Sequence, residues 1–173
     1  LVASAAETEQ LAREAAPEDR TYFVPAFTGL GAPYWDSSAT GILCGITRTT
    51  GKAEMVRAGL DCIAYQITDI LKAMEEDAGI PIRELRVDGG PTKNAYLMQF
   101  QSDMAGIPVQ VPEAEELSGI GAAYAAGIGL GIYKKEELFA KMKRTSFEPQ
   151  MEKSLVDKKY SGWKIAVEMV LGK

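Results

Sequence analysis

The stretch LRVDGGPTKNAYLMQFQSD, residues 85–103, decides the fold class of this chain. It opens with Leu85–Val87, whose apolar ends predict a short strand. Two glycines, Gly89 and Gly90, follow the strand and predict a tight turn. A helical pattern begins at about Asn94, because apolar residues recur every three or four positions at Leu97, Phe100 and Met104.

Strand, glycine turn and helix, in this order, can form a cradle for phosphate groups. Because Gly89 and Gly90 lack a Cβ, their backbone can approach an anion closely, and the free N–H groups of the following helix point at it. An Asp-Gly-Gly sequence also occurs simply as a turn. The residues alone therefore leave both interpretations open.

The composition is that of an ordinary soluble globular protein. The chain has 173 residues, enough for one domain or a domain and a half with a substantial core. Its net charge of −5 and the absence of a basic cluster argue against nucleic acid as a partner. We expect no membrane attachment, because no apolar run approaches a spanning length and Glu7 and Glu9 lie where a signal peptide would be basic and then apolar.

The chain contains no histidine. This excludes Ser-His and Cys-His nucleophile pairs and most zinc sites, so that any proton transfer would need a carboxylate. Cys44 and Cys62 stand alone without metal-binding spacing, and we interpret both as reduced core residues of a cytoplasmic protein.

The rest of the chain alternates short strands with helices, which predicts the α/β class. The clearest helix carries an apolar stripe from Met55 to Met74, and Gly79 with Pro81 ends it. Ser118 is expected to cap the helix at 119–130. The other expected strands are 22–27, 41–47 and 109–111, and the other expected helices are 1–16, 134–143 and 151–171.

Two segments, the loop 28–38 and the helix at 119–130, each allow two interpretations. In the loop 28–38, Trp35 either anchors the loop onto the core, which we favour, or forms a ligand site with Tyr34 and Asp36. The helix at 119–130 is rich in glycine, which costs helix stability, so we expect close helix packing there, or direct contact with a ligand.

Several separate blocks of this sequence resemble the C-terminal half of the FGGY carbohydrate kinases, and among them the branch that phosphorylates glycerol. The likeness covers about residues 22–163, and Gly59 and the run Pro91-Thr92-Lys93 depart from the usual pattern. The blocks are FVPAFTGLGAPYWD (23–36), GILCGI (41–46), EMVRAGLD (54–61), VDGG (87–90), MQFQSD (98–103) and GAAY (121–124).

The resemblance implies the ribonuclease H-like (actin-like ATPase) fold, with ATP and Mg²⁺ bound between two domains. Carried over by position, Gly90 would lie against the ATP phosphates and Asn94 would reach the nucleotide. Gly89 would permit the turn. Asp88 would border the phosphate and Mg²⁺ region, or would instead hold the turn by accepting backbone N–H bonds.

The resemblance also implies that residues 1–173 form the nucleotide-side C-terminal domain of a longer protein, without its N-terminal domain. The chain begins at Leu1 rather than Met, and the family's catalytic aspartate and main polyol-binding residues precede the matching segment. We therefore assign no catalytic residue in this chain, including Asp36 and Asp103, and expect the chain alone to be inactive.

In the family the sheet begins with strands that precede Leu1, so we expect an exposed strand edge and self-association as a homo-oligomer. The small-molecule substrate would be a polyol or sugar, most simply glycerol. The alternatives are another FGGY sugar kinase, of the xylulose, gluconate or ribulose type, and a non-enzymatic actin-like nucleotide-binding module. An oxidoreductase is disfavoured, because no strand leads into Gly119-Ile120-Gly121 and no complete dinucleotide fingerprint exists.

Overall fold

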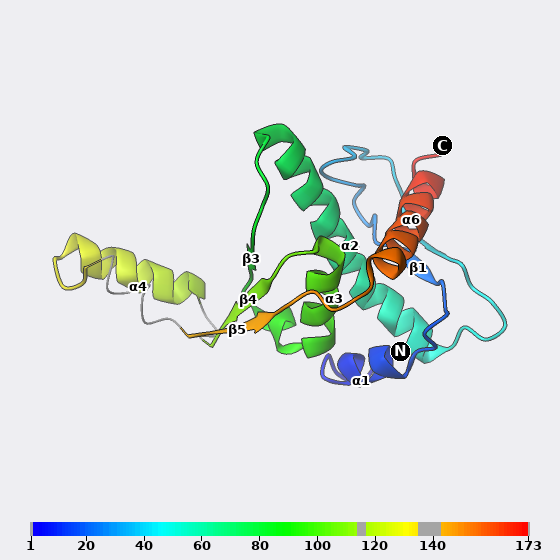
Figure 1. Ribbon diagram of the computed structural model, residues 1–173, viewed down its shortest axis with the longest axis horizontal. Coiled ribbons are helices and arrows are strands. Elements are labelled where there is room, and N and C mark those ends of the chain that lie inside the picture. Colours follow the sequence, from blue (N-terminus) through cyan, green and yellow to red (C-terminus); the bar gives the residue numbers. More distant parts are fainter. Residues whose placement is uncertain (1, 114–116, 135–142, 173) are drawn as a thin grey trace.

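The chain has an α/β fold (Figure 1), as the sequence predicts. The computed structural model describes residues 2–113, 117–134 and 143–172. Its helices and strands, in chain order, are α1 (Glu7–Glu14), β1 (Tyr22–Val24), β2 (Ile42–Cys44), α2 (Lys52–Ala78), β3 (Leu85–Arg86), the 3₁₀ helix η1 (Gly90–Lys93), α3 (Ala95–Ala105), β4 (Val109–Pro112), α4 (Leu117–Gly129), β5 (Arg144–Phe147) and α6 (Lys153–Val170).

The long helix α2 runs through the middle of the molecule, with α1, α3 and α6 packed around it (Figure 1). At its start, the Glu54 carboxylate accepts the backbone N–H of Gly51 at 2.9 Å. At its end, Gly79 adopts a left-handed conformation, with φ 66°, that a residue with a Cβ rarely takes. These two signals explain why one continuous helix forms between them.

Two small sheets flank this helical centre. The strands β1 and β2 pair in antiparallel fashion, with Phe23 opposite Leu43. In the second sheet, β4 lies between β3, which is parallel to it, and β5, which is antiparallel. Strand β5 was not predicted from the sequence, because the four residues Arg144–Phe147 carry no apolar run and pair only through the tertiary structure.

Aromatic rings fill the core between α2, α3 and α6. The rings of Tyr65 and Trp163 are stacked with centroids 5.3 Å apart, and Phe100 meets Tyr65 edge-on at 5.4 Å. Trp163 is fully buried, as are Leu97 of α3 and Val24 of β1. Three helices and the strands β1 and β4, through Val24 and Val109, therefore share a single core.

The boundaries differ from the sequence predictions where local chemistry intervenes. Strand β1 ends at Val24, because Pro25 has no N–H to continue a ladder. Strand β2 ends before Gly45, whose φ of 74° turns the chain. Helix α1 is shorter than the predicted 1–16, and α4 begins at Leu117, so Ser118 lies inside it and the predicted cap is wrong.

Two further sequence predictions concern a helix at 134–143 and the absence of membrane attachment. The predicted helix at 134–143 falls almost entirely outside the described residues. In the part of the chain that the structure describes, no helix combines the length and apolar character that a bilayer crossing needs.

The loop 28–38 is fixed to the core by a tyrosine rather than by the expected tryptophan. Tyr34 donates its hydroxyl to the buried Asp69 carboxylate at 2.7 Å. Trp35 is instead 78% exposed and has a φ of 52°. The anchoring role predicted for Trp35 is therefore wrong, because the phenol of its neighbour satisfies the buried charge.

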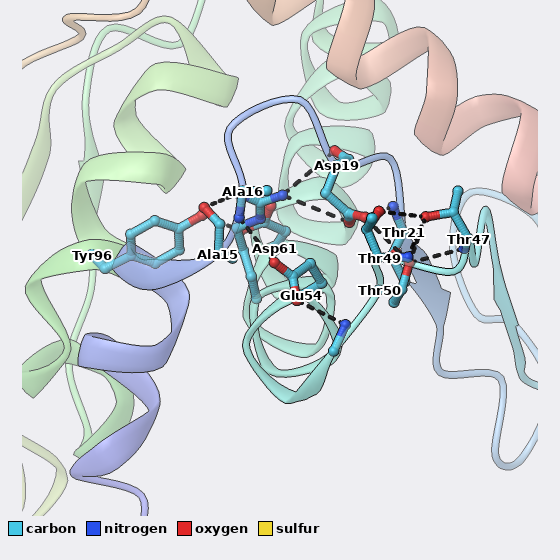
Figure 2. Close-up of polar contacts among 12 residues, drawn as sticks. Ala15, Ala16, Asp19, Thr21, Thr47, Thr49, Thr50, Glu54, Asp61 and Tyr96 are labelled. Atoms are coloured by element: carbon cyan, nitrogen blue, oxygen red, sulfur yellow. Dashed lines mark hydrogen bonds and ion pairs between the residues drawn. The ribbon is translucent and has the colours of Figure 1, made fainter.

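A polar network joins the end of α1 to the start of α2 (Figure 2). The Glu54 carboxylate accepts the N–H of Ala16 at 3.0 Å. The buried guanidinium of Arg57 donates to the Ala15 carbonyl at 3.2 Å and lies 3.7 Å from the Asp19 carboxylate. This network pins the segment that connects α1 to β1.

Asp61 is a second buried carboxylate on α2. Tyr96 of α3 donates its hydroxyl to it at 2.8 Å (Figure 2). Burial raises the pKa of Asp61 to about 6, although the Tyr96 hydrogen bond and the positive charges of Lys159 and Arg57 oppose the rise. At neutral pH the protein therefore holds a desolvated negative charge here.

We predict that Asp61→Asn stabilises the chain at pH 7 by about 2 kcal/mol. The folded pKa is raised, so the protonated form favours folding, and stability falls as pH rises from about 4 through about 6. The amide keeps an acceptor for Tyr96 but carries no charge. Urea unfolding at pH 4 and pH 7 measures this: the variant should show a smaller loss of stability between them, and an equal loss would contradict the prediction.

Candidate functional site

The predicted glycine turn connects β3 to α3. Gly89 has a φ of 96°, a conformation that strongly favours glycine. Gly90 begins the 3₁₀ helix η1, and no atom lies within 4 Å of the place that its Cβ would occupy. Both glycines are exposed. The turn therefore leaves its backbone open to close approach by a ligand.

Thr92 holds the turn closed. Its backbone N–H donates to the Gly89 carbonyl at 3.1 Å, and its hydroxyl donates to the same oxygen at 2.8 Å. Thr92 was not predicted as a residue of the site. A threonine three positions after a glycine, which can bond back to it, was the signal that could have found it.

Asn94 is the N-cap of α3. Its Oδ1 accepts the N–H of Leu97 at 3.0 Å, and its Nδ2 donates to the Thr8 hydroxyl of α1 at 3.2 Å. Glu9, also of α1, accepts the N–H of Ala95 at 2.9 Å. The predicted nucleotide contact thus has a structural task as well, and its neighbours on α1 were missed because they lie 86 residues away in sequence.

Asp88 lies at the exposed start of the turn. In the part of the chain that the structure describes, no contact is seen in which its carboxylate accepts a backbone N–H of the turn. Thr92 performs the turn-holding task that the sequence analysis offered as one role for Asp88. Among the described residues, no protein group contacts the Asp88 carboxylate.

Asp36 holds its own loop, whereas Asp103 ties α3 to the segment that precedes α6. The Oδ1 of Asp36 accepts the N–H groups of Ser38 and Ala39 at 2.8 and 3.2 Å. Asp103 accepts the N–H groups of Gln150 and Met151 at 2.7 and 3.1 Å. These contacts give each carboxylate a structural reason to be present.

The glycine-rich helix α4 projects from the body of the molecule (Figure 1). Gly119, Gly121 and Gly129 have no atom within 4 Å of their missing Cβ positions, and only Gly127 lies against a side chain, the ring of Tyr133. Among the described residues, the expected close packing of another helix is therefore not seen. The ring of Tyr133 explains the need for glycine at 127 alone.

The described residues contain no group of three or more His, Cys, Asp or Glu side chains that could hold a metal ion. Cys44 and Cys62 are free thiols, and burial raises the pKa of Cys62 to about 12. Neither cysteine is therefore a reactive thiolate at neutral pH.

Comparison with known proteins gives the family. The C-terminal domain of the FGGY family of carbohydrate kinases matches residues 2–130, which include β1, α2, the glycine turn, α3 and α4. This chain belongs to the FGGY family. The resemblance read from the sequence blocks is thereby confirmed, and the oxidoreductase alternative has no support.

The chain is similar to bacterial glycerol kinases over nearly its whole length. It is 49% identical to the glycerol kinase of Petrotoga mobilis over 97% of this chain and 34% of the relative. It is 46% identical to that of Geobacillus sp. over 99% of this chain and 35% of the relative. The chain thus spans about a third of the length of the relatives that it matches.

Solved structures show the same fold. The glycerol kinase of Plasmodium falciparum, solved with ADP, superposes with a TM-score of 0.87 and 34% identity, over 98% of this chain and 34% of that one. A xylulose kinase from Rhodospirillum rubrum gives 0.77 and 25%, over 96% of this chain and 34% of that one. The ribonuclease H-like fold of the FGGY kinases is therefore confirmed.

Proposed function

We propose that this FGGY chain is the nucleotide-side domain of an ATP-dependent kinase that transfers the γ-phosphoryl group of ATP to a hydroxyl of glycerol. The observation that carries the proposal is the open turn at Gly89 and Gly90, which leads into a helix capped by Asn94. A helix N-terminus behind an exposed glycine turn suits a phosphate chain. Family membership supports the choice of a kinase.

The residues of the turn fit a nucleotide. The empty space beside Gly90 admits a phosphate to its backbone, and Asn94 presents an amide at the start of α3. Asp88 would border the phosphates and their Mg²⁺, which kinases commonly hold through a carboxylate and the phosphate oxygens themselves. Bound ATP and Mg²⁺ supply the phosphoryl group and neutralise its charge, while this chain binds and orients the nucleotide.

Glycerol is the favoured substrate because the relatives at 46–49% identity are glycerol kinases, whereas the xylulose kinase structure is only 25% identical. Another FGGY sugar kinase is the alternative within the family. A non-enzymatic actin-like module is the alternative outside it, and a substrate screen on the full-length reading frame separates the three. The acidic composition and the free thiols suit a cytoplasmic protein that binds no nucleic acid and no membrane.

We predict that Asn94→Ala lowers the affinity of the chain for ADP by about tenfold, because it removes an amide that contacts the nucleotide. Titration calorimetry with ADP and Mg²⁺ measures this. Asn94→Ala also removes the cap of α3, so Asn94→Ser is the matched control: serine retains a capping oxygen but has no amide. Both variants should bind weakly, and the serine variant should keep the thermal stability of the wild type. Equal affinity in all three proteins, or no binding by the wild type, would contradict the nucleotide assignment.

We predict that the purified 173-residue chain does not phosphorylate glycerol. Phosphoryl transfer needs groups from both walls of a closed cleft, and the carboxylates Asp36 and Asp103 are occupied by backbone N–H groups. A coupled assay that follows ADP formation tests this with glycerol and with a pentose. ATP-dependent phosphorylation of either compound by this chain would overturn the assignment of residues 1–173 as one domain of a larger enzyme.

We also propose that the chain forms a homo-oligomer. An apolar stripe on α2 lacks a cover among the described residues, and its most exposed members are Ile63, Ile70 and Met74, at 36%, 41% and 55%. Gly59 lies on the same stripe with empty space beside it. In the described part of the second sheet, β3 pairs only with β4, so its other edge is free.

Helix α2 is self-complementary when two copies pair in antiparallel orientation. Ile70 of one copy would then face the gap beside Gly59 of the other, and Lys52 would face Asp77. We predict that Ile70→Lys shifts the chain toward monomer in light scattering at tens of micromolar, while Ile165→Lys, at a more exposed site on α6, does not. A wild-type protein that is monomeric at this concentration would contradict the proposal.

A further inference from the structure

Helix α1 makes a set of polar contacts with the start of α3 that the proposed function does not use. The Thr8 hydroxyl has a single proton and donates it to the Ala5 carbonyl at 2.6 Å. It must therefore accept the bond that it shares with Asn94 Nδ2 at 3.2 Å. Thr8 thus contributes a fixed acceptor to the Asn94 amide.

The Asn94 amide is consequently held in one orientation. Its Oδ1 is fixed by the N–H of Leu97 at 3.0 Å, and one N–H of Nδ2 is fixed by Thr8. A rotation of the amide by 180° would place two donors, or two acceptors, against each other. The second N–H of Nδ2 is what the side chain can still offer to a ligand, and it suits an acceptor atom such as a phosphate oxygen or a ring nitrogen.

A second contact steadies the same helix start. The Glu9 carboxylate accepts the N–H of Ala95, the first residue of α3, at 2.9 Å. Arg13 donates to the other oxygen of this carboxylate and is the main reason why the pKa of Glu9 lies below its usual value. Glu9 therefore remains a charged acceptor at neutral pH. It holds the N–H of Ala95, the residue that directly follows Asn94.

The far end of α1 is fixed independently. Glu54 accepts the N–H of Ala16, and the buried Arg57 donates to the Ala15 carbonyl (Figure 2). Helix α1 therefore cannot slide along α3 without breaking bonds to α2. Its position, and with it the position of Thr8, is set by the core.

We propose that Thr8 is a positioning residue that orients the Asn94 amide toward the nucleotide, while Glu9 holds the first residue of α3 in place through the Ala95 N–H. The inference rests on the proposed nucleotide site. It extends that site to a helix that lies 86 residues earlier in the sequence. Thr8 acts through Asn94, so its effect on binding exists only while the Asn94 amide is present.

The test is the ADP affinity of Thr8→Val in the intact 173-residue chain, measured by titration calorimetry with Mg²⁺. Valine keeps the shape of threonine but cannot accept the Asn94 bond, and we expect the affinity to fall about three- to tenfold, the range for one uncharged hydrogen bond. Thr8→Ser keeps the hydroxyl and should bind ADP like the wild type. Gln10→Ala, on the exposed face of the same helix, is the control for an unspecific effect on α1.

A double-mutant cycle separates positioning from a general loss of stability. Thr8→Val should cause no further loss of ADP affinity in an Asn94→Ala background, where the amide is absent. Equal additional losses in both backgrounds, or unchanged affinity in Thr8→Val while Asn94→Ala is weakened, would overturn the positioning role and leave the proposed function standing. Absence of ADP binding by the wild type would overturn both.

Discussion

A charged side chain on the buried face of α2 must be satisfied, and this requirement organises much of the structure. Asp69 is only 3% exposed, and an unpaired charge at such a site would be strongly destabilising. Its carboxylate accepts hydrogen bonds from Tyr34 at 2.7 Å, Tyr160 at 2.5 Å and Trp163 at 2.7 Å. The loop 28–38 and helix α6 are therefore both tied to the same point of α2.

The same helix carries Asp61 about two turns before Asp69 and Arg57 about three turns before it. Each of these buried groups finds its partner on a different element: Asp61 on α3 through Tyr96, and Arg57 on the segment after α1. Because α1 and α3 are both fixed to α2 in this way, they meet at Asn94 with little freedom. The core thus determines the geometry of the candidate nucleotide site, which it reaches through the N–H of the buried Leu97.

Some surfaces of the chain, unlike its buried charged groups, have no partner among the described residues. The stripe on α2, the exposed helix α4 and the free edge of β3 are apolar or unsatisfied surfaces that a folded protein normally covers. Among the described residues, the ring of Tyr133 accounts for Gly127 of α4, and the other glycines of this helix have open space beside them. The chain spans about a third of the length of the relatives that it matches. The described core around Trp163, by contrast, is buried.

The sequence by itself determined the elements with strong local signals. The periodicity and the terminal glycine of α2, the strand, glycine turn and helix at 85–105, and the N-terminal position of Asn94 all follow from propensity and spacing, and they agree with the structure. The motif blocks fixed the family. A local signal is sufficient for these features because the chain's own neighbours satisfy them.

Tertiary structure decided what depends on contacts between distant residues. Strand β5 exists because β4 offers it an edge, and Tyr34 rather than Trp35 anchors its loop because a buried carboxylate lies within reach. Thr8 meets Asn94 only because α2 holds both helices in place. No pattern along the chain encodes these partners, since hydrogen-bond complementarity between remote segments appears only once the core has brought them together.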